Sequence, residues 1–273
     1  RGQNNVQGAN DAGATPIFLP GYQRVDDPKV HAKYVESWGV NFPSDPGLNL
    51  NEMMKKIGSG IHGLFIMGED IVLSEPNSCE LDEHMQSLEF VVMQDIFLNG
   101  TSRFADVILP GACFAEKDGV FTNSERRVQR VRKAVEPPGK ARADWEILID
   151  FANASGANWT YKSTNEIYNE YVKDAPKFAG LSHERIENEG GLHWPCYDHE
   201  DSGTPFLHKD GVMRGKGKLV PVDYRPSLES GDEDFPMILS TGRTLYHYNA
   251  ATQTRFSGGT SIKQPEAFLQ IHP

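Results

Sequence analysis

Short apolar runs that end in acidic or amide side chains constrain most strongly how this chain can fold. One run is GLFIMGED at residues 63–70, a second is LEFVVMQD at residues 88–95, and a shorter third run covers Val107 to Leu109 before Pro110. Segments with helical spacing flank these runs, at 28–38, 50–57 and 144–156. Buried strands that alternate with helices predict an α/β fold, in which flanking helices form layers over a mostly parallel sheet.

The character of the sequence changes after Gly156. Residues 157–232 contain many Trp, His, Gly and Pro residues and are read as a loop-rich connecting region, after which FPMILSTGRTLYHYN restarts a β pattern. We therefore expect an α/β domain over 1–156, a connector over 157–232 and the beginning of a β domain over 233–273. Because the chain starts at Arg1 and stops within that β pattern, we expect it to be part of a longer protein.

Polar residues at the ends of the apolar runs are the first candidates for a ligand site, because ligands of open α/β sheets bind beyond the carboxyl ends of the strands. These residues are Glu69, Asp70, Gln94, Asp95 and Gly111. An Asp carboxylate repels phosphate but accepts hydrogen bonds from the N1–H and amine edge of guanine. The opening stretch RGQNNVQGANDAG suits a pyrophosphate, since glycines and asparagines leave backbone N–H groups accessible in turns. Taken singly, these features are an ordinary turn and ordinary helix caps, and it is their joint occurrence that favours a nucleotide-type ligand.

The acidic balance of the chain limits its partners. The formal net charge is −11, which argues against nucleic acid as the main partner, because phosphate binding needs a basic face. No run approaches the roughly 18 apolar residues of a membrane span, and none is expected. The cysteines Cys79, Cys113 and Cys196 form no C-x-x-C pair, so neither a disulfide framework nor an iron–sulfur motif is readable. A reducing cytoplasm is the expected location.

Other conspicuous features favour ordinary structural roles. His193, Cys196 and His199 stand three residues apart, but a closed zinc site needs a fourth ligand. The basic segment 124–133, SERRVQRVRK, is read as a solvated surface strand rather than a docking site. Cys113 has no base suggested nearby and is read as a small buried residue. We therefore assign no metal ligand within the chain.

A series of motifs runs in one order along nearly the whole chain: RGQNNVQGANDAG, IMGED, VVMQDIFLNGTSRFADVILPG, EKDGVFTNSERRVQR, ADWEI, HWPC and LSTGRTLYHYN. Together they resemble the molybdenum or tungsten formate dehydrogenases of the bis-pterin oxidoreductase superfamily. The opening GQNNVQG is most similar to the formate dehydrogenase branch, whereas the strand-end and ADVILP motifs are shared more widely. The resemblance implies an oxidoreductase that interconverts formate and carbon dioxide.

The resemblance also implies roles for the residues that match these motifs. Arg1 would lie beside the metal and orient the substrate carboxylate, since a guanidinium fork suits a small planar anion. The positions matched to cofactor contacts are Gln3, Asp70, Ser74, Gln94, Asp95, Gly111, Asp144, Arg243 and His247. Gly111 departs from the pattern, because it stands where a serine can contact the cofactor, and Thr244 stands where a glutamate is found. Without the resemblance, Arg1 reads as an ordinary terminal residue.

Cofactors and partners follow from the same resemblance. It implies a bis-molybdopterin guanine dinucleotide carrying Mo or W. A [4Fe–4S] cluster, and the Cys or Sec that binds the metal, would belong to an earlier part of the subunit, and 233–273 would begin a C-terminal β-barrel domain. Formate and carbon dioxide would be the substrates. Electrons would leave through iron–sulfur subunits, such as a ferredoxin, an NAD(P)-linked module or a hydrogenase module.

Two alternatives stay open at this point. One is a related bis-pterin enzyme that acts on another small oxyanion, as nitrate reductases do. The other is a respiratory-complex subunit that keeps the fold as a scaffold without the cofactor. The joint presence of Arg1, Asp70, Gln94, Asp95 and Asp144 argues against the scaffold, which has no need of a guanine site.

Overall fold

The computed structural model describes residues 4–209, 211–212 and 215–271. By internal contacts the chain divides into two units, Arg1–Leu207 and His208–Pro273. The first unit contains two sheets with their flanking helices, described below. Its other elements are α1 (Val6–Asp11), β1 (Phe18–Leu19), β2 (Gln23–Arg24), α2 (Pro28–Trp38), α3 (Leu50–Lys56), η1 (Gly100–Phe104), η2 (Phe114–Glu116) and η3 (Pro176–Phe178). None of the helices in these described ranges has the length and apolar character needed to cross a membrane.

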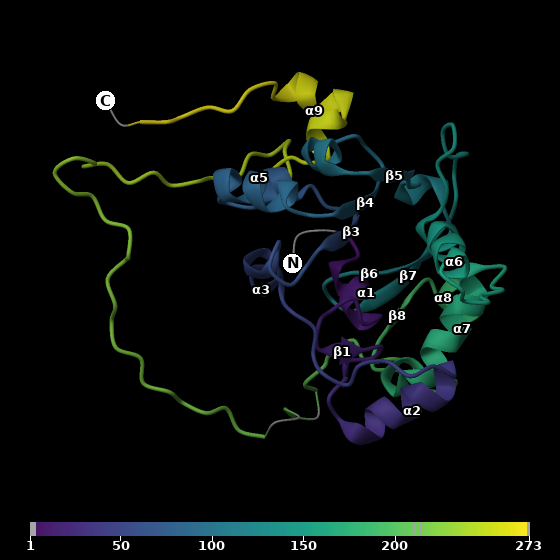
Figure 1. Ribbon diagram of the computed structural model, residues 1–273. Helices are drawn as coiled ribbons and strands as arrows, with labels where there is room; N and C mark the ends of the chain where they lie inside the picture. Colours follow the sequence, from purple (N-terminus) through teal and green to yellow (C-terminus); the bar gives the residue numbers. More distant parts are fainter. Residues whose placement is uncertain (1–3, 210, 213–214, 272–273) are drawn as a thin grey trace. The chain divides into compact units, whose positions relative to one another are not determined.

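A three-stranded parallel sheet holds the strands expected from the apolar runs (Figure 1). Its order is β3 (Gly63–Met67), β4 (Phe90–Asp95) and β5 (Val107–Pro110). Between β3 and β4 the chain forms α4 (Ile71–Ser74) and α5 (Ser78–Gln86), the helical crossover that parallel strands need. The α/β fold and the parallel sheet predicted from the sequence are therefore confirmed.

The two faces of this sheet are covered differently. On one face Ile66 and Val91 pack with Leu81 and Met85 of α5, and all four side chains are buried. On the other face lies α6 (Asp144–Ala154), where the Phe151 ring contacts Phe65 of β3 at 5.2 Å between centroids. The helix predicted over 144–156 is thus confirmed. It begins at Asp144, which is one of the predicted site residues.

A second sheet is antiparallel and consists of β6 (Gly119–Thr122), β7 (Arg127–Val131) and β8 (Leu192–His193). It packs against α7 (Thr164–Asp174) and α8 (His183–Asn188) around a buried apolar cluster that includes Val128, Phe178 and Ile186. The basic segment 124–133 therefore does contain a strand. Only some of its side chains face solvent, because Val128 is buried in that cluster.

Helices occupy part of the region that was expected to be loop-rich. The sequence of α7, TNEIYNEYVKD, places Tyr168 and Val172 four residues apart, so that both are buried on one face. That short pattern is hidden in a region whose composition is dominated by Trp, His, Gly and Pro. The domain boundaries near 156 and 232 stay predictions.

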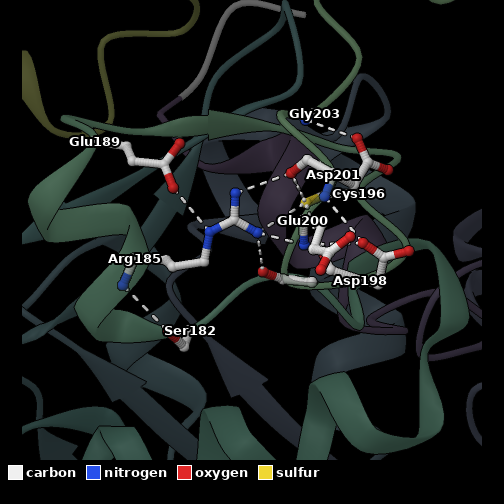
Figure 2. A network of polar contacts seen from close by, with 9 residues as sticks. Ser182, Arg185, Glu189, Cys196, Asp198, Glu200, Asp201 and Gly203 are labelled. Carbon is white, nitrogen blue, oxygen red and sulfur yellow. Dashed lines mark hydrogen bonds and ion pairs between the residues drawn. The ribbon is translucent and has the colours of Figure 1, made fainter.

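The loop after β8 is held in place by two arginines. Arg185 of α8 donates from its guanidinium to the backbone carbonyls of Gly180 (2.7 Å), Asp198 (3.2 Å) and Asp201 (2.8 Å), as Figure 2 shows for the labelled residues. Arg126, which directly precedes β7, donates to the carbonyls of Trp194 and Thr204. The loop is therefore fastened through its own backbone.

The second unit contains η4 (Thr254–Phe256) and α9 (Gly258–Lys263). Across its described residues no strand forms, although 235–249 carries the predicted β pattern. Apolar side chains in that pattern are exposed, among them Met237, Ile238 and Leu239. A strand needs a neighbour to receive its backbone hydrogen bonds, and 235–249 has none here. A β-barrel domain beginning at 233 stays a prediction.

Candidate functional site

The carboxyl ends of β4 and β5 bring predicted site residues together. Gln94 near the end of β4 donates from Nε2 to Oδ1 of Asp144, the first residue of α6, at 2.8 Å. The N–H of Gly111, which follows β5, donates to the carbonyl of Asp95 at 3.0 Å. A Cβ added at Gly111 would lie 3.2 Å from Asp144 Oδ1. The serine expected at this position would therefore crowd the Asp144 carboxylate, whereas glycine leaves it room.

Gln94 is almost completely buried, yet its amide is only half used. The side chain is 1% exposed, and Oε1 has no hydrogen-bond partner among the described residues. A buried acceptor without a partner is unfavourable by roughly 1–3 kcal/mol. Gln94 is thus poised to accept a hydrogen bond from a ligand that carries an N–H or O–H group.

Lys117 is part of this cluster, although the sequence reading did not assign it. Its ammonium group pairs with Asp144 Oδ2. Lys117 is the only cation in the sequence between Arg103 and Arg126, within EKDGVFTN, and that isolation is the signal by which the sequence could have identified it. The pair places a positive group beside the carboxylate to which the buried Gln94 amide donates.

Asp95 closes its own turn while staying close to the end of β4. Its Oδ1 accepts from the N–H of Ile96 at 2.6 Å, and its Oδ2 accepts from Asn99 Nδ2 at 3.0 Å. Burial raises the pKa of the Asp95 carboxyl, the backbone N–H bonds oppose this rise, and the negative charges of Asp70 and Glu69 add to it. Oδ1 also accepts from the N–H of Phe97 at 3.4 Å, so Oδ2 is the oxygen that keeps a lone pair for a further donor.

Asp70 is buried and serves first as a cap. Its Oδ1 accepts from the N–H of Thr101 at 3.1 Å and from Thr101 Oγ1 at 2.8 Å, and Oδ2 accepts from the Gly100 N–H at 3.3 Å. These bonds join the end of β3 to the 3₁₀ turn after β4. Ser74 is exposed and donates to Glu69 Oε1 at 2.6 Å. Ligand binding by Asp70 and Ser74 stays a prediction.

The opening stretch is described only from Asn4, so the assignments of Arg1 and Gln3 lie outside the described residues. Asn5 accepts through Oδ1 from the Thr122 N–H of β6 at 3.0 Å. Asp11, at the end of α1, accepts through Oδ2 from the indole N–H of Trp194 at 2.8 Å and through Oδ1 from Gln7. Burial raises the pKa of Asp11. Part of the polar character of this stretch therefore anchors α1 to the fold.

The remaining predicted residues, Arg243 and His247, belong to the second unit. His247 contacts Thr254 Oγ1 at 3.0 Å through Nδ1 and the Gln264 carbonyl at 2.7 Å through Nε2. Arg243 is exposed. The structure does not place these two residues relative to the strand ends of the first unit, and their cofactor contacts stay predictions.

In the HWPCYDH segment, His193 is part of β8 and Cys196 is packed into the fold. Cys196 is fully buried beside Arg185, and burial raises the pKa of its thiol. In the described ranges no grouping of three His, Cys, Asp or Glu side chains is arranged to hold a metal ion. Cys113, expected to be buried, is half-exposed because it precedes the short turn of η2 at the surface.

A cavity of about 900 Å³ lies elsewhere in the first unit, among α1, α2, α6, α7 and β6. Its lining is mostly apolar and aromatic, with Trp38, Trp145 and Trp159 among its residues. None of the predicted site residues that the structure describes lines it, although Asn5, Gly8 and Asp11 of the opening stretch do. The strand-end cluster, rather than this cavity, gathers the polar groups that a nucleotide needs.

Known proteins match this chain along its whole length. Residues 1–154 match the family model described as molybdopterin oxidoreductase. The F420-dependent formate dehydrogenase subunit alpha of Methanocaldococcus jannaschii is 44% identical over an alignment of 277 residues, and this alignment covers 100% of this chain and 41% of that protein. The F420-dependent formate dehydrogenase 1 subunit alpha of Methanococcus maripaludis is 42% identical over the same shares.

More distant matches extend the comparison. The probable oxidoreductase YjgC of Bacillus subtilis is 41% identical over 100% of this chain and 28% of its own length. The solved structure of acetylene hydratase from Pelobacter acetylenicus overlaps 60% of this chain and 23% of its own, with 17% identity and a TM-score of 0.45, too low to bear on function. This chain thus spans less than half the length of the curated relatives.

Proposed function

Since the chain belongs to the molybdopterin oxidoreductase family, we propose that it forms part of the catalytic subunit of a formate dehydrogenase, which interconverts formate and carbon dioxide. The proposal is supported by the relatives at 44% and 42% identity, which carry that name and align with all of this chain. Because this chain spans 41% of those relatives, the activity is proposed for the full-length protein.

The observation that carries the cofactor part of the proposal is the unpartnered, buried Oε1 of Gln94. It lies in a cluster with the carboxylate of Asp144, close to the turn at Asp95. Guanine presents N–H donors at N1 and at its exocyclic amine, and these acceptors suit that edge. We therefore propose that Gln94, Asp95, Asp144 and the Gly111 backbone hold the guanine dinucleotide of a molybdopterin cofactor.

The bound cofactor, with Mo or W, would supply the redox chemistry. The protein's own part is to bind and to orient. Lys117 pairs with Asp144 and holds its carboxylate in place, and Gly111 leaves room beside it. Arg1 would hold the formate carboxylate with its guanidinium fork, and Gln3 would support the pterin. Asp70, Ser74, Arg243 and His247 would complete the cofactor contacts.

Partners and location belong to the same proposal. A [4Fe–4S] cluster in another part of the subunit would take up the electrons, and an iron–sulfur partner would carry them away. We propose a cytoplasmic enzyme whose electron acceptor is a ferredoxin, a nicotinamide-linked module or a hydrogenase module. Assays of the full-length enzyme with each carrier would distinguish them.

The cofactor assignment predicts the effect of replacing Asp144 by asparagine in the full-length enzyme. The guanine dinucleotide content should fall about tenfold or more, because a charge-assisted hydrogen bond contributes roughly 1.5–3 kcal/mol. Asp150→Asn is the control, since Asp150 lies on the same helix, is exposed and pairs with Arg142. Cofactor extraction and circular dichroism check the result. Equal cofactor content in the two folded variants would contradict the assignment.

The substrate assignment predicts how Arg1 variants of the full-length enzyme behave. Arg1→Lys keeps the charge but loses the fork, so kcat/KM for formate should fall about tenfold, and Arg1→Ala should lower it about a hundredfold. Metal content and folding should be retained in both. Arg24→Lys, at an exposed ion pair with Asp26, is the control. Wild-type formate kinetics in both Arg1 variants, with full metal content, would remove Arg1 from the substrate site.

A further inference from the structure

The helix α1 begins at an asparagine whose side chain does not cap it. Asn5 is the N-cap residue of α1 and has a φ of 60°, a left-handed conformation that asparagine tolerates. A side chain at this position usually accepts from an N–H of the first turn, but within α1, all of which is described, Asn5 makes no such bond. Its Oδ1 instead accepts from the backbone N–H of Thr122 in β6 at 3.0 Å. The side chain therefore fastens the start of α1 to the antiparallel sheet.

A glycine one turn later makes this contact possible. A Cβ added at Gly8 would lie 2.0 Å from Asn5 Oδ1 and 2.9 Å from Asn5 Cγ. A side chain at position 8 would therefore displace the amide whose oxygen reaches Thr122. Both residues belong to the stretch NNVQGAND, so one short segment of sequence encodes the contact.

The end of α1 is fastened by a buried carboxylate. Asp11 is 2% exposed, and its Oδ2 accepts from the indole N–H of Trp194, directly after β8, at 2.8 Å. The Asp11 carbonyl accepts from the N–H of Gly21 at 2.8 Å and from the hydroxyl of Tyr171 in α7 at 3.3 Å. With six residues, α1 is too short to be stable as an isolated helix. Its direction is therefore set by the attachments at its two ends.

We propose that Asn5 and Asp11 are positioning residues of the substrate site. Together they hold α1 against the second sheet, and so they set the direction of the chain that precedes the helix. Four residues of chain span at most about 14 Å, so an anchored Asn5 limits how far from β6 the Arg1 backbone can lie. Both residues act through Arg1 in this role. The inference rests on the proposed function, because it takes Arg1 as the group that holds formate.

The chemistry proposed for Arg1 explains why such anchoring matters. A guanidinium fork binds a planar carboxylate best when two of its N–H groups face the two oxygens. A displacement of about 1 Å in a group that orients a substrate can lower catalysis about a hundredfold. A loosened α1 would keep the positive charge of Arg1 but would let its fork turn, so formate affinity should fall. Cofactor content should change little, because the bonds of Gln94 and Asp144 at the strand ends do not involve α1.

Asn5→Gly in the full-length enzyme tests the attachment at the start of α1. Glycine removes the side chain and accepts the positive φ without strain. The KM for formate should rise about tenfold, and kcat should fall by less than about threefold, because ground-state binding is what weakens. Hydrogen exchange gives a readout that does not depend on activity. The Thr122 amide should exchange about tenfold faster or more once its acceptor is removed.

Trp194→Phe tests the attachment at the end of α1. Phenylalanine keeps an aromatic ring but lacks the indole N–H that reaches Asp11. The KM for formate should rise in this variant too, by about threefold or more.

Asn49→Gly is the matched control for a general loss of stability. Asn49 Oδ1 accepts from the Glu52 N–H, also at 3.0 Å, and caps α3. Its loss should lower stability about as much as the loss of the Asn5 side chain, because each removes one hydrogen bond. The KM for formate should stay at the wild-type value in the control. Circular dichroism and cofactor analysis of all variants check that folding and loading are retained.

The outcomes separate this inference from the proposed function. An unchanged KM in folded Asn5→Gly or Trp194→Phe enzyme, or a KM that rises equally in Asn49→Gly, would overturn the positioning role and leave the proposed function standing. A Thr122 amide that exchanges at the wild-type rate in Asn5→Gly would do the same. Wild-type enzyme that carries its cofactor and does not turn over formate would overturn the proposed function, and this inference with it.

Discussion

Arg185→Met should lower the free energy of unfolding by about 3–5 kcal/mol, because one guanidinium bonds several groups of the loop at once. Its donors reach the carbonyls of Gly180, Asp198 and Asp201 and the carboxylate of Glu189, the last at 2.8 Å (Figure 2). The side chain is only 18% exposed, so water replaces these bonds poorly. Methionine keeps the apolar stem but donates nothing.

Urea unfolding, followed by circular dichroism, would measure this loss. Arg142→Met is the control, because Arg142 makes an exposed ion pair with Asp150 and its loss should change stability by less than about 1 kcal/mol. Arg185→Lys should recover only part of the loss, since an ammonium cannot span the three carbonyls. If the Arg185 and Arg142 variants lost equal stability, the loop would not depend on the guanidinium.

Gly180→Ala should destabilise the protein by about 3 kcal/mol, for a steric reason at the same loop. An added Cβ would lie 2.1 Å from the Asp198 carbonyl oxygen and 2.7 Å from Cys196 Sγ. The N–H of Gly180 also donates to the Cys196 carbonyl at 2.9 Å, so the two backbones cannot separate without breaking that bond. The two Asp198 atoms in closest contact, the carbonyl oxygen and its carbon, are backbone, which cannot move aside as a flexible side chain can.

The matched substitution for this prediction is Gly60→Ala. A Cβ at Gly60 meets nothing within 4 Å, so its effect should stay within about 0.5 kcal/mol. Urea midpoints of the two variants, measured together, give the comparison. A Gly180→Ala protein as stable as Gly60→Ala would mean that segment 196–198 approaches Gly180 less closely than the structure shows.

The regular elements of the first unit were predictable because their signal is local. A strand of a parallel sheet shows a short apolar run, which is why β3, β4 and β5 could be read from GLFIM, FVVMQD and VILP, although only β4 is buried along most of its length. Parallel strands then place their polar ends at one edge, and this rule brought Gln94, Asp95 and Gly111 into the same prediction. The same local signal failed for α7, whose apolar pattern is short.

The partners of the polar side chains were not predictable from any pattern. Asp70, whose assignment to the cofactor stays a prediction, also caps the turn at Thr101, while Lys117 was not expected at all and pairs with Asp144. Both partners come from other elements, and neither pairing leaves a periodicity in the sequence. The roles of Arg1 and Gln3 rest on the resemblance to the family and stay predictions.

The sequence by itself determined that β3, β4 and β5 are strands, that α6 is a helix, that the sheet is parallel, and to which family the chain belongs. Burial acts on neighbouring residues along each element and so leaves a repeating pattern that can be read. Only the tertiary structure decided that Asp11 holds Trp194, 183 residues away, that Arg185 fastens the loop after β8, and that Asn5 bonds the backbone of Thr122. Those contacts depend on which segments meet in space. A hydrogen bond between residues far apart in the sequence forms only when the fold brings donor and acceptor together, and it leaves no repeating pattern in the sequence.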